Sequence, residues 1–353
     1  MTSLDLQAPV RELLRALVDI ESVSGNEVAI TDAIEAGLRS LAHLSVERAG
    51  NVLVARTSLG RNQRVLLAGH TDTVPLAGNL PSRLDGERLY GCGTTDMKGG
   101  LAVLLSLAAT IVQPRHDVTY VAYDCEEVAA ARNGLGRVAA AHPEWLSTDL
   151  AILLEPTNAL IEAGCQGTLR VEVTVPGVRA HTARAWLGVN AIHNAAPLLA
   201  TLSSFDARRV EIDGCDYREG LSAVRVRGGV SGNVVPDECV VEINFRFAPD
   251  RSESDALVYV QQVLTPYQVS LVDVAGGALP GLSQPAAKEF VAAVGGAPVG
   301  KLGWTDVARF SALGVPALNF GPGDPLVAHT ADEYVDLPQV DRAFDVLLRY
   351  LTP

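Results

Sequence analysis

The sequence predicts an α/β fold in which a smaller α+β domain is inserted into a larger domain with a mainly parallel sheet. Short apolar runs alternate with helical patterns through the first half of the chain, as in a parallel sheet covered by helices on both faces. Near residue 169 the pattern changes to strict apolar–polar alternation, which indicates half-exposed strands. After the Gly/Pro-rich stretch at 276–282 the apolar runs return. We therefore expect a larger domain at 1–169 and 281–353 and an inserted domain at 170–280.

The larger domain begins with helical and extended patterns in alternation. Apolar residues recur at helical spacing in the first two segments and again in the run that follows a Gly-rich turn. The expected helices are 8–20, 27–43 and 99–112, and the expected strands are 52–57, 64–70, 118–124 and 150–156. This order of strands and helices is typical of a parallel sheet.

The inserted domain follows a β-α-β-β pattern. The segment L-R-V-E-V-T-V-P (169–176) alternates strictly, and a helix is expected over 188–202. Two more alternating segments follow, A-V-R-V-R-G-G-V (223–230) and C-V-V-E-I-N-F-R-F (239–247). The pattern predicts a small open-faced, ferredoxin-like sandwich in which helices cover one face of the sheet.

The composition excludes several classes of partner. The chain has 353 residues with 41 acidic and 28 basic side chains, a net charge of −13, which argues against nucleic acid and against an anionic membrane surface. The start of the chain lacks the pattern of a signal peptide, and the longest apolar run (101–112) is too short to span a bilayer. The five irregularly spaced cysteines form neither a disulfide framework nor a Cys-x-x-Cys site, so we expect reduced thiols in a cytoplasmic protein.

Acids and histidines follow several of the expected strands or lie in turns. Any one of them alone would be an ordinary core, capping or turn residue. They are His70, Asp72, Asp96, Glu126, Glu127, Glu155 and His329. Because the carboxyl ends of parallel strands share one edge of a sheet, these side chains are expected to crowd into one cleft. So many charges in one place would be unfavourable without a cation among them.

The residue types indicate which cation this would be. Two histidines with three or more carboxylates suit zinc or a similar divalent metal. One metal needs only about three protein ligands, so the surplus predicts two metals about 3.5–4 Å apart that share a bridging carboxylate. One glutamate would remain as a base.

Five segments in order carry a resemblance to a known family. They are H-T-D-T-V-P (70–75), G-C-G-T-T-D-M-K-G-G (91–100), the Glu126–Glu127 pair, E-P (155–156) and A-H-T (328–330). Together they resemble the co-catalytic zinc aminoacylases and peptidases, a family that includes acetylornithine deacetylase, carboxypeptidase G and succinyl-diaminopimelate desuccinylase. The resemblance extends over nearly the whole chain. It implies a metal-dependent amide hydrolase with two Zn²⁺ per subunit, for which Co²⁺ can substitute.

The same resemblance implies a role for each residue. His70 and Glu155 would bind one zinc, Glu127 and His329 the other, and Asp96 would bridge both. Asp72 would orient His70, Glu126 would act as general base, and the peptide after Asp96 would be cis. His181 of the inserted domain would donate a hydrogen bond to the developing oxyanion across a homodimer. The larger domain is then catalytic, and the inserted domain is a lid and dimerisation domain.

The substrate is inferred from further segments. G-W-T-D-V-A-R-F (303–310) and N-F-R-F-A-P-D-R (244–251) resemble actinobacterial succinyl-diaminopimelate desuccinylases. This resemblance implies hydrolysis of N-succinyl-LL-2,6-diaminopimelate to succinate and LL-2,6-diaminopimelate, in lysine biosynthesis. Since that substrate carries three carboxylates and arginine pairs well with carboxylates, Arg246 and Arg309 are candidate contacts, together with Asn233 and Thr305.

Two other functions stay open at this stage. The turn at 164–167 reads G-C-Q-G where many desuccinylases carry two arginines, which leaves room for another N-acyl amino acid. One alternative is therefore an acetylornithine deacetylase or a dipeptidase of the same family. The other is a binding or scaffold protein that has kept the fold and lost catalysis.

Overall fold

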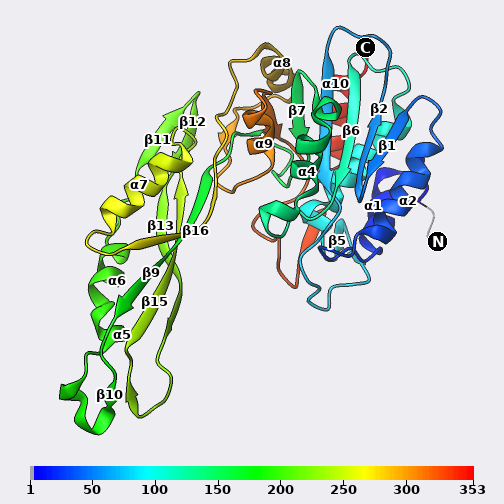
Figure 1. Ribbon diagram of the computed structural model, residues 1–353. Helices are drawn as coiled ribbons and strands as arrows, with labels where there is room; N and C mark the ends of the chain where they lie inside the picture. Colours follow the sequence, from blue (N-terminus) through cyan, green and yellow to red (C-terminus); the bar gives the residue numbers. More distant parts are fainter. Residues whose placement is uncertain (1–3) are drawn as a thin grey trace. The chain divides into compact units, whose positions relative to one another are not determined.

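The computed structural model describes residues 4–353, which form two compact units (Figure 1). The first unit contains the described residues up to Ala163 together with Pro280–Val299 and Arg309–Pro353. The second unit contains Gly164–Leu279 and Gly300–Ala308. The inserted domain expected from the sequence covers 170–280, whereas the observed unit begins earlier and also includes residues 300–308.

The contacts of 300–308 give the physical reason for this difference. Lys301 accepts a backbone hydrogen bond from Gln166, and the indole of Trp304 donates to the carbonyl of Gly276. Strand β9 (Gly167–Pro176) pairs with β15 (Glu238–Phe247) along its whole length, so all of it belongs to the second unit. Such pairings join segments that are distant in sequence, so the local pattern of apolar and polar residues does not predict them.

An eight-stranded sheet organises the first unit. Its strand order is β1-β2-β6-β3-β7-β18-β8-β17. The strands are β1 (Ser45–Ala49), β2 (Val52–Arg56), β3 (Arg64–His70), β6 (Asp117–Tyr123), β7 (Leu150–Leu153), β8 (Glu162–Ala163), β17 (Val299–Gly300) and β18 (Ala317–Asn319). The pairs β6–β3, β3–β7 and β7–β18 are parallel, whereas β1–β2, β2–β6 and β18–β8 are antiparallel. The sheet is therefore mixed, with a parallel centre that carries the predicted strand ends.

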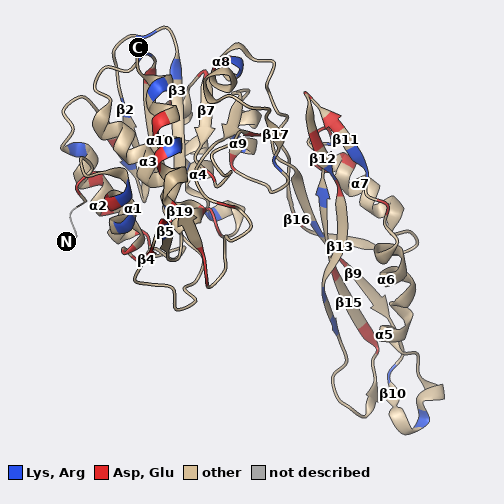
Figure 2. Cartoon of the chain, turned by 180° about the vertical axis from the view of Figure 1, so that it is seen from behind, with Lys and Arg blue, Asp and Glu red and all other residues tan. Residues whose placement is uncertain are grey.

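Helices pack on this sheet according to their apolar patterns. The first unit contains α1 (Val10–Val18), α2 (Val28–Arg39), α3 (Gly99–Thr110), α4 (Gly134–Ala141), α8 (Pro285–Val294), α10 (Leu337–Leu351) and the short turns η1 (Thr94–Lys98), η2 (Ala130–Arg132) and η3 (Pro143–Leu146). Helix α3 is apolar on nearly all sides and is buried against β3, β6, α1 and α10. Helix α10 is amphipathic, and the cartoon in Figure 2 colours both acidic and basic residues along it.

A small antiparallel sheet lies beside the Gly-rich turn. It consists of β4 (Arg83–Asp85), β5 (Arg88–Tyr90) and β19 (Tyr334–Asp336), in the order β19-β5-β4. The pairing of β19 with β5 joins the chain after His329 to the chain before Asp96. Helix α9 (Val307–Ala312) follows residues 300–306.

The second unit is a four-stranded antiparallel sheet with helices on one face (Figure 1). Its main strands run in the order β13-β15-β9-β16, with two small two-stranded sheets beside them. Its elements are β9, β10 (Ala180–His181), η4 (Thr182–Leu187), α5 (Ala191–Asn194), α6 (Ala196–Ser203), β11 (Arg209–Ile212), β12 (Cys215–Arg218), β13 (Gly220–Gly228), β14 (Val234–Val235), β15, α7 (Glu253–Val263) and β16 (Val269–Ala275). Alternate apolar residues of β9 and β15 pack with those of α5, α6 and α7. The other face of the sheet is uncovered within the unit, as an open-faced sandwich requires.

Most predicted elements are present, with corrections at their ends. The strand expected at 64–70 is β3, and those expected at 52–57 and 118–124 match β2 and β6 within one residue. The helix expected at 188–202 begins at Ala191, where the Asn190 side chain accepts from two backbone amides, and it is divided at Ala195. The strand β1, the β11–β12 hairpin and the β4–β5–β19 sheet are not among the predicted elements, because their strands are short and few of their residues are buried.

Two further expectations concern the whole chain. Within residues 4–353, no helix has the length and apolar character needed to cross a membrane. All five cysteines are buried and free, which agrees with the predicted thiols.

Candidate metal centre

Parallel strands bring the predicted residues to one edge of the first unit's sheet. His70 is the last residue of β3 and pairs in register with Tyr123, the last residue of β6. The amide of Thr71 donates to the Tyr123 carbonyl at 2.7 Å, so the two chains leave the sheet together. Glu126 and Glu127 follow β6 three and four residues later. The predicted convergence of strand ends is therefore present.

The carboxylate of Asp96 lies between two imidazoles. Its Oδ1 is 3.1 Å from Nε2 of His70, and its Oδ2 is 3.3 Å from Nε2 of His329. Nε2 of His329 is also 2.8 Å from Oε1 of Glu127. Asp96 thus presents one oxygen to each histidine, which is the arrangement that a ligand bridging two cations requires. The peptide bond from Asp96 to Met97 is cis, as the resemblance implied.

The predicted ligand Glu155 is placed by the neighbouring strand. Strand β7 pairs in parallel with β3, with Leu153 opposite Ala68, and the amide of Leu154 donates to the Ala68 carbonyl. Continued along both chains, this register brings Glu155 to the level of His70. The Glu155 side chain is buried.

Asp72 holds the turn that carries the two glutamates. Its fully buried carboxylate accepts hydrogen bonds from the amide of Glu126 at 3.0 Å and from the amide of Glu127 at 3.2 Å. The hydroxyl of Ser24 donates to the same carboxylate at 2.7 Å. Nδ1 of His70 lies 3.0 Å from the backbone carbonyl of Asp72 and 3.5 Å from its carboxylate. With its proton on Nδ1, the His70 ring would donate to these Asp72 oxygens and leave Nε2 as the metal-ligand atom. This geometry fits the predicted role of Asp72 in orienting His70.

The carboxylates shift the pKa values of the groups around them. Burial disfavours the charged form of His70, but the carboxylates of Asp72 and Asp96 outweigh burial and raise the pKa of His70 well above its ordinary value. Hydrogen bonds to Asp96 and Glu127 raise the pKa of His329 to about 10. Burial raises the pKa of Asp72, but His70, Ser24 and the Glu126 amide lower it by more, to about 2.

These residues fit a pair of divalent cations. The shifts show a local field that favours positive charge at the histidine nitrogens. One ligand atom each from His70, Asp96 and Glu127 lies within 4.8 Å of the other two. Two imidazoles and several carboxylates, with no thiolate, form a donor set for zinc or a similar metal. His329 is about half exposed while His70 is buried, so the site opens toward solvent on the His329 side.

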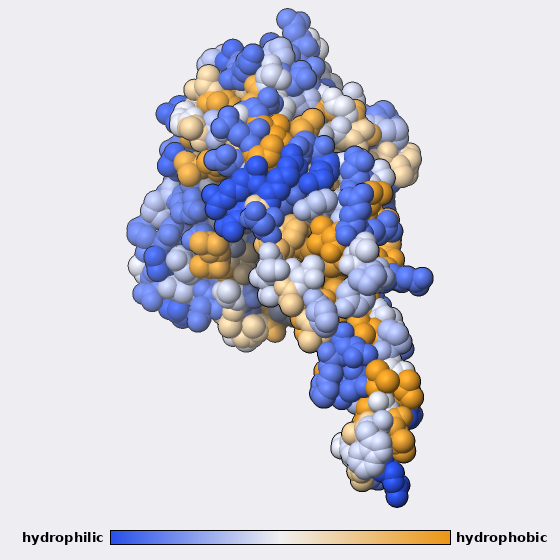
Figure 3. All heavy atoms as spheres, turned by 90° about the vertical axis from the view of Figure 1, so that its left-hand side faces the viewer, coloured by the Kyte–Doolittle hydropathy of each residue, from blue (hydrophilic) through white to orange (hydrophobic). Residues whose placement is uncertain are grey.

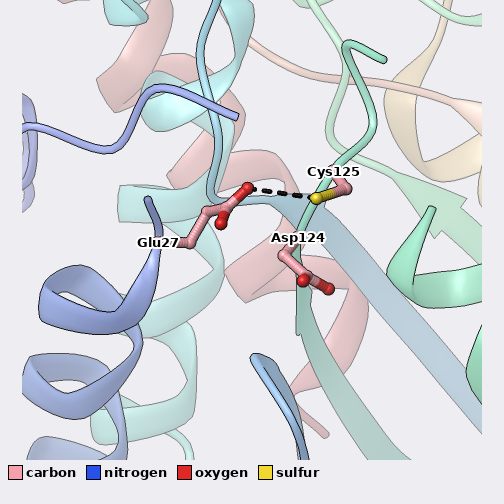
Figure 4. Close-up of side chains that lie close together, drawn as sticks. All are labelled: Glu27, Asp124 and Cys125. Atoms are coloured by element: carbon pink, nitrogen blue, oxygen red, sulfur yellow. Dashed lines mark hydrogen bonds between the residues drawn. The ribbon is translucent and has the colours of Figure 1, made fainter. Parts of the chain in front are cut away.

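A second buried cluster consists of Glu27, Asp124 and Cys125, the last two of which directly precede the glutamate pair in sequence (Figure 4). Oε1 of Glu27 accepts from the thiol of Cys125 at 3.3 Å and from the amide of Gly25 at 2.7 Å. The Asp124 carboxylate accepts two hydrogen bonds from the guanidinium of Arg137. Burial and Glu27 raise the pKa of the Cys125 thiol to about 11. Since these acids have donors of their own, the cluster needs no metal ion to balance it.

The predicted contacts in the second unit lie in two groups. His181 in β10 pairs with Val234 in β14, and the amide of Thr182 donates to the carbonyl of Asn233, so His181 and Asn233 are neighbours. The His181 ring is exposed and accepts from the amide of Ala183. Arg246 lies near the opposite end of β15, where it pairs with Thr168.

The two remaining substrate candidates differ in environment. Thr305 is buried in the second unit, where its carbonyl accepts from the thiol of Cys165. Arg309 lies in the first unit beside Gly136 of α4, since a Cβ atom on that glycine would be 2.7 Å from the Arg309 guanidinium.

Two residues at the site, Ser24 and Glu333, are not among those predicted from the sequence. Buried Glu333 accepts from the backbone amides of Gly93, Thr95 and Asp96 at 3.0, 2.9 and 3.1 Å. Burial raises the pKa of the Glu333 carboxyl to about 7, although the three amide donors act in the opposite direction. Glu333 lies four residues after His329 and next to another acid, so no apolar pattern in the sequence marks it as buried.

Comparison with known proteins yields a family match and close relatives. The sequence model of Peptidase family M20/M25/M40 matches residues 66–352. A Mycobacterium tuberculosis protein provisionally assigned as the succinyl-diaminopimelate desuccinylase DapE is 57% identical over 351 residues, 99% of each chain. The succinyl-diaminopimelate desuccinylase of Corynebacterium glutamicum is 49% identical over 360 residues, 99% of this chain and 98% of the relative.

Two solved structures share the fold. A tripeptidase from Staphylococcus aureus has a TM-score of 0.78 at 20% identity, covering 99% of this chain and 98% of its own. A dinuclear metal-binding M20 peptidase from Bacillus subtilis has a TM-score of 0.68 at 15% identity, covering 98% of this chain and 97% of its own.

Proposed function

Because this chain belongs to Peptidase family M20/M25/M40, we propose that its metal centre hydrolyses N-succinyl-LL-2,6-diaminopimelate to succinate and LL-2,6-diaminopimelate. The observation that carries this proposal is identity of 57% and 49%, over essentially whole chains, to relatives that bear the desuccinylase name. These relatives favour desuccinylation over the acetylornithine and dipeptide alternatives. The presence in this chain of each residue that the chemistry requires also favours an enzyme over a scaffold protein.

The proposed ligands follow the observed arrangement. His70 and Glu155 would hold one zinc, Glu127 and His329 the other, and Asp96 would contact both, with cobalt as an expected substitute. When bound, such cations lower the pKa of a water molecule and polarise an amide carbonyl. The Asp96 contacts to both imidazoles support this assignment.

The protein's own groups would move the protons. Glu126 is partly exposed at the strand end, and its amide is held by Asp72, so its carboxylate can reach water. As general base it would take a proton from the attacking water, and as general acid it would return that proton to the leaving amine. The amine must be protonated to depart, which explains why one glutamate beside the ligands stays outside the ligand set.

We propose that the second unit supplies the oxyanion donor through a homodimer. His181 lies beyond one end of the β9–β15 ladder and Arg246 lies near the other end, and the ladder itself spans about 30 Å at about 3.3 Å per residue. That separation argues against both side chains of one chain serving one small substrate, and a second copy would resolve it. Exposed apolar side chains such as Trp186 and Val226 support an interface, and Figure 3 shows apolar patches on this unit in its lower part.

Arginines are the proposed partners of the substrate carboxylates. Acids of the second unit form ion pairs with Arg179, Arg225 and Arg227, so these arginines are less available to bind a substrate carboxylate. Among residues 4–353, no carboxylate forms an ion pair with Arg246, so we assign Arg246 to a substrate carboxylate. Arg309, Thr305 and Asn233 are further proposed contacts. A biosynthetic role of this kind would place the protein in the cytoplasm.

The test is a comparison of substrates and variants. The zinc-loaded protein is assayed with N-succinyl-LL-diaminopimelate and with N-acetylornithine, before and after chelation. Turnover of the succinyl compound that is lost on chelation and restored by zinc is expected. Glu126→Gln should keep both zinc ions and lose nearly all turnover. Preference for N-acetylornithine would overturn the substrate assignment, and an active Glu126→Gln variant would overturn the base assignment.

A further inference from the structure

We propose that Glu333 is a positioning residue of the metal centre. It fixes the turn that carries Asp96, so that one carboxylate oxygen of Asp96 faces His70 and the other faces His329. The inference rests on the proposed function, because it concerns the same pair of cations. It assigns to Glu333 no contact with metal or substrate. Its role is to determine how strongly the proposed ligands hold the cations.

The three hydrogen bonds of Glu333 all reach one turn. Its Oε1 accepts from the amides of Thr95 and Asp96, and its Oε2 accepts from the amide of Gly93. These amides belong to a stretch whose backbone is irregular at Asp96, so helix hydrogen bonds do not satisfy them. A single buried carboxylate therefore supplies the acceptors that this stretch lacks.

Glu333 is itself fixed to the segment that carries His329. Its amide donates to the carbonyl of Thr330, the residue after His329, and its carbonyl accepts from the amide of Gly91. The next residue, Tyr334, begins β19 and pairs with Tyr90 of β5. The backbone of Glu333 thus binds the His329 segment, while its side chain binds the Asp96 turn. The residue joins two ligand-bearing segments that are more than 200 residues apart in sequence.

The turn leaves little room for another arrangement. Gly93 has a φ of +79°, and a Cβ atom there would lie 2.6 Å from the side chain of Thr73. With Gly93 held in this conformation, its amide and those of Thr95 and Asp96 point to one place. Glutamine in place of Glu333 would direct an NH₂ group at one or more of these N–H groups, because an amide has only one acceptor oxygen.

The expected consequence is weaker metal binding. Since the Asp96 oxygens lie 3.1 and 3.3 Å from the two imidazoles, a small displacement of the turn changes the distance to both. Loss of a group that orients a metal ligand typically reduces metal affinity by about 10–100-fold. We expect a loss in this range for Glu333→Gln, and a smaller loss for Glu333→Asp, which keeps the charge but is shorter by one methylene.

The test measures metal affinity directly. Full-length zinc-loaded protein and its variants are titrated with a chelator, and the zinc retained is counted by elemental analysis. The matched control is Asp332→Asn, which removes one negative charge from the adjacent exposed position and should leave zinc affinity unchanged. In cobalt-loaded Glu333→Gln, the visible cobalt absorption should change in position or intensity, which a merely less stable fold would not produce.

The outcomes separate this inference from the proposed function. If the wild-type protein holds two zinc ions and cleaves the succinyl substrate while Glu333→Gln keeps wild-type zinc affinity, the inference is wrong. A lower melting temperature with unchanged zinc affinity and cobalt spectrum would also overturn it, because that pattern marks a purely structural role. If Glu333→Gln does not fold, Glu333→Asp decides by the same measurements. If wild-type protein binds no zinc pair, the proposed function itself fails.

Discussion

Replacement of Asp72 by asparagine tests how the site is built. The Asp72 carboxylate is fully buried, and it accepts from the amides of Glu126 and Glu127 and from the hydroxyl of Ser24. Asparagine has nearly the same shape but only one acceptor oxygen. In either orientation its NH₂ group faces an amide N–H of Glu126 or Glu127, so at least one donor loses its acceptor.

The magnitude follows from these contacts. A hydrogen bond to a charged group contributes about 1.5–3 kcal/mol, and one or two such bonds are lost. The free energy of unfolding of Asp72→Asn should therefore fall by about 2–5 kcal/mol. Because the same turn carries the proposed base and a proposed ligand, and because His70 loses its charged neighbour, kcat should fall by about 10–100-fold. The Michaelis constant should change little, since Asp72 does not reach the substrate.

The assay combines steady-state kinetics, zinc analysis and urea unfolding. Ser24→Ala is the matched control, because it removes one donor to the same carboxylate and leaves both amides paired. It should cost about 1.5 kcal/mol of stability, the lower end of the range above because no buried donor loses its acceptor, and only a few-fold in kcat. If Asp72→Asn keeps wild-type kcat and zinc content, or behaves as Ser24→Ala does, the argument that Asp72 holds the glutamate turn is refuted.

Three further substitutions test other parts of the first unit. Gly100→Ala should lower the free energy of unfolding, measured in urea, by about 3 kcal/mol or more, because the new Cβ would lie 2.0 Å from the Leu154 carbonyl oxygen. Gly220→Ala is the control, because the space around Gly220 is open. Cys125→Val should cost about 1–3 kcal/mol, since Cys125 has a φ of +58° and its thiol donates to Glu27, whereas Cys125→Ser keeps a donor and should cost less. Burial lowers the pKa of His116, so the unfolded chain binds the proton more readily, and stability is lost as pH falls below about 6.5. His116→Gln should reduce the loss of melting temperature between pH 7 and pH 5, and an unchanged pH dependence would contradict this assignment.

The sequence predicted those site residues that follow buried parallel strands. His70 and the Glu126–Glu127 pair each come at or after the end of an apolar run. Because parallel strands have their carboxyl ends at one edge of the sheet, these residues lie at that edge regardless of the conformation of the loops. Asp96 differs, because it lies in an irregular turn rather than at a strand end. The proposal that Asp96 bridges two cations came from the resemblance of the Gly-rich motif and not from periodicity.

Contacts between distant segments could not be read from the sequence. Glu333 is recognisable only once β19 pairs with β5 and brings its carboxylate to the amides of the Asp96 turn. The assignment of residues 300–308 to the second unit depends in the same way on Trp304 and Lys301 contacting the chain near 166 and 276. In each case the position of the residue depends on a hydrogen bond between segments far apart in sequence, and local propensity does not predict such a bond.

The structure also explains why adjacent glutamates can end a buried strand. A chain that leaves a sheet exposes amides without partners, and each needs an acceptor. Here two carboxylates outside the proposed ligand set supply them: Asp72 accepts from the amides of Glu126 and Glu127, and Glu333 accepts from those around Asp96. In their ionised forms these acids add negative charge where Glu127 and Asp96 already concentrate it, so the acceptors that stabilise the turns also increase the need for cations. Backbone order and metal binding at this edge of the sheet are therefore two consequences of the same buried carboxylates, and removal of either acid should weaken both.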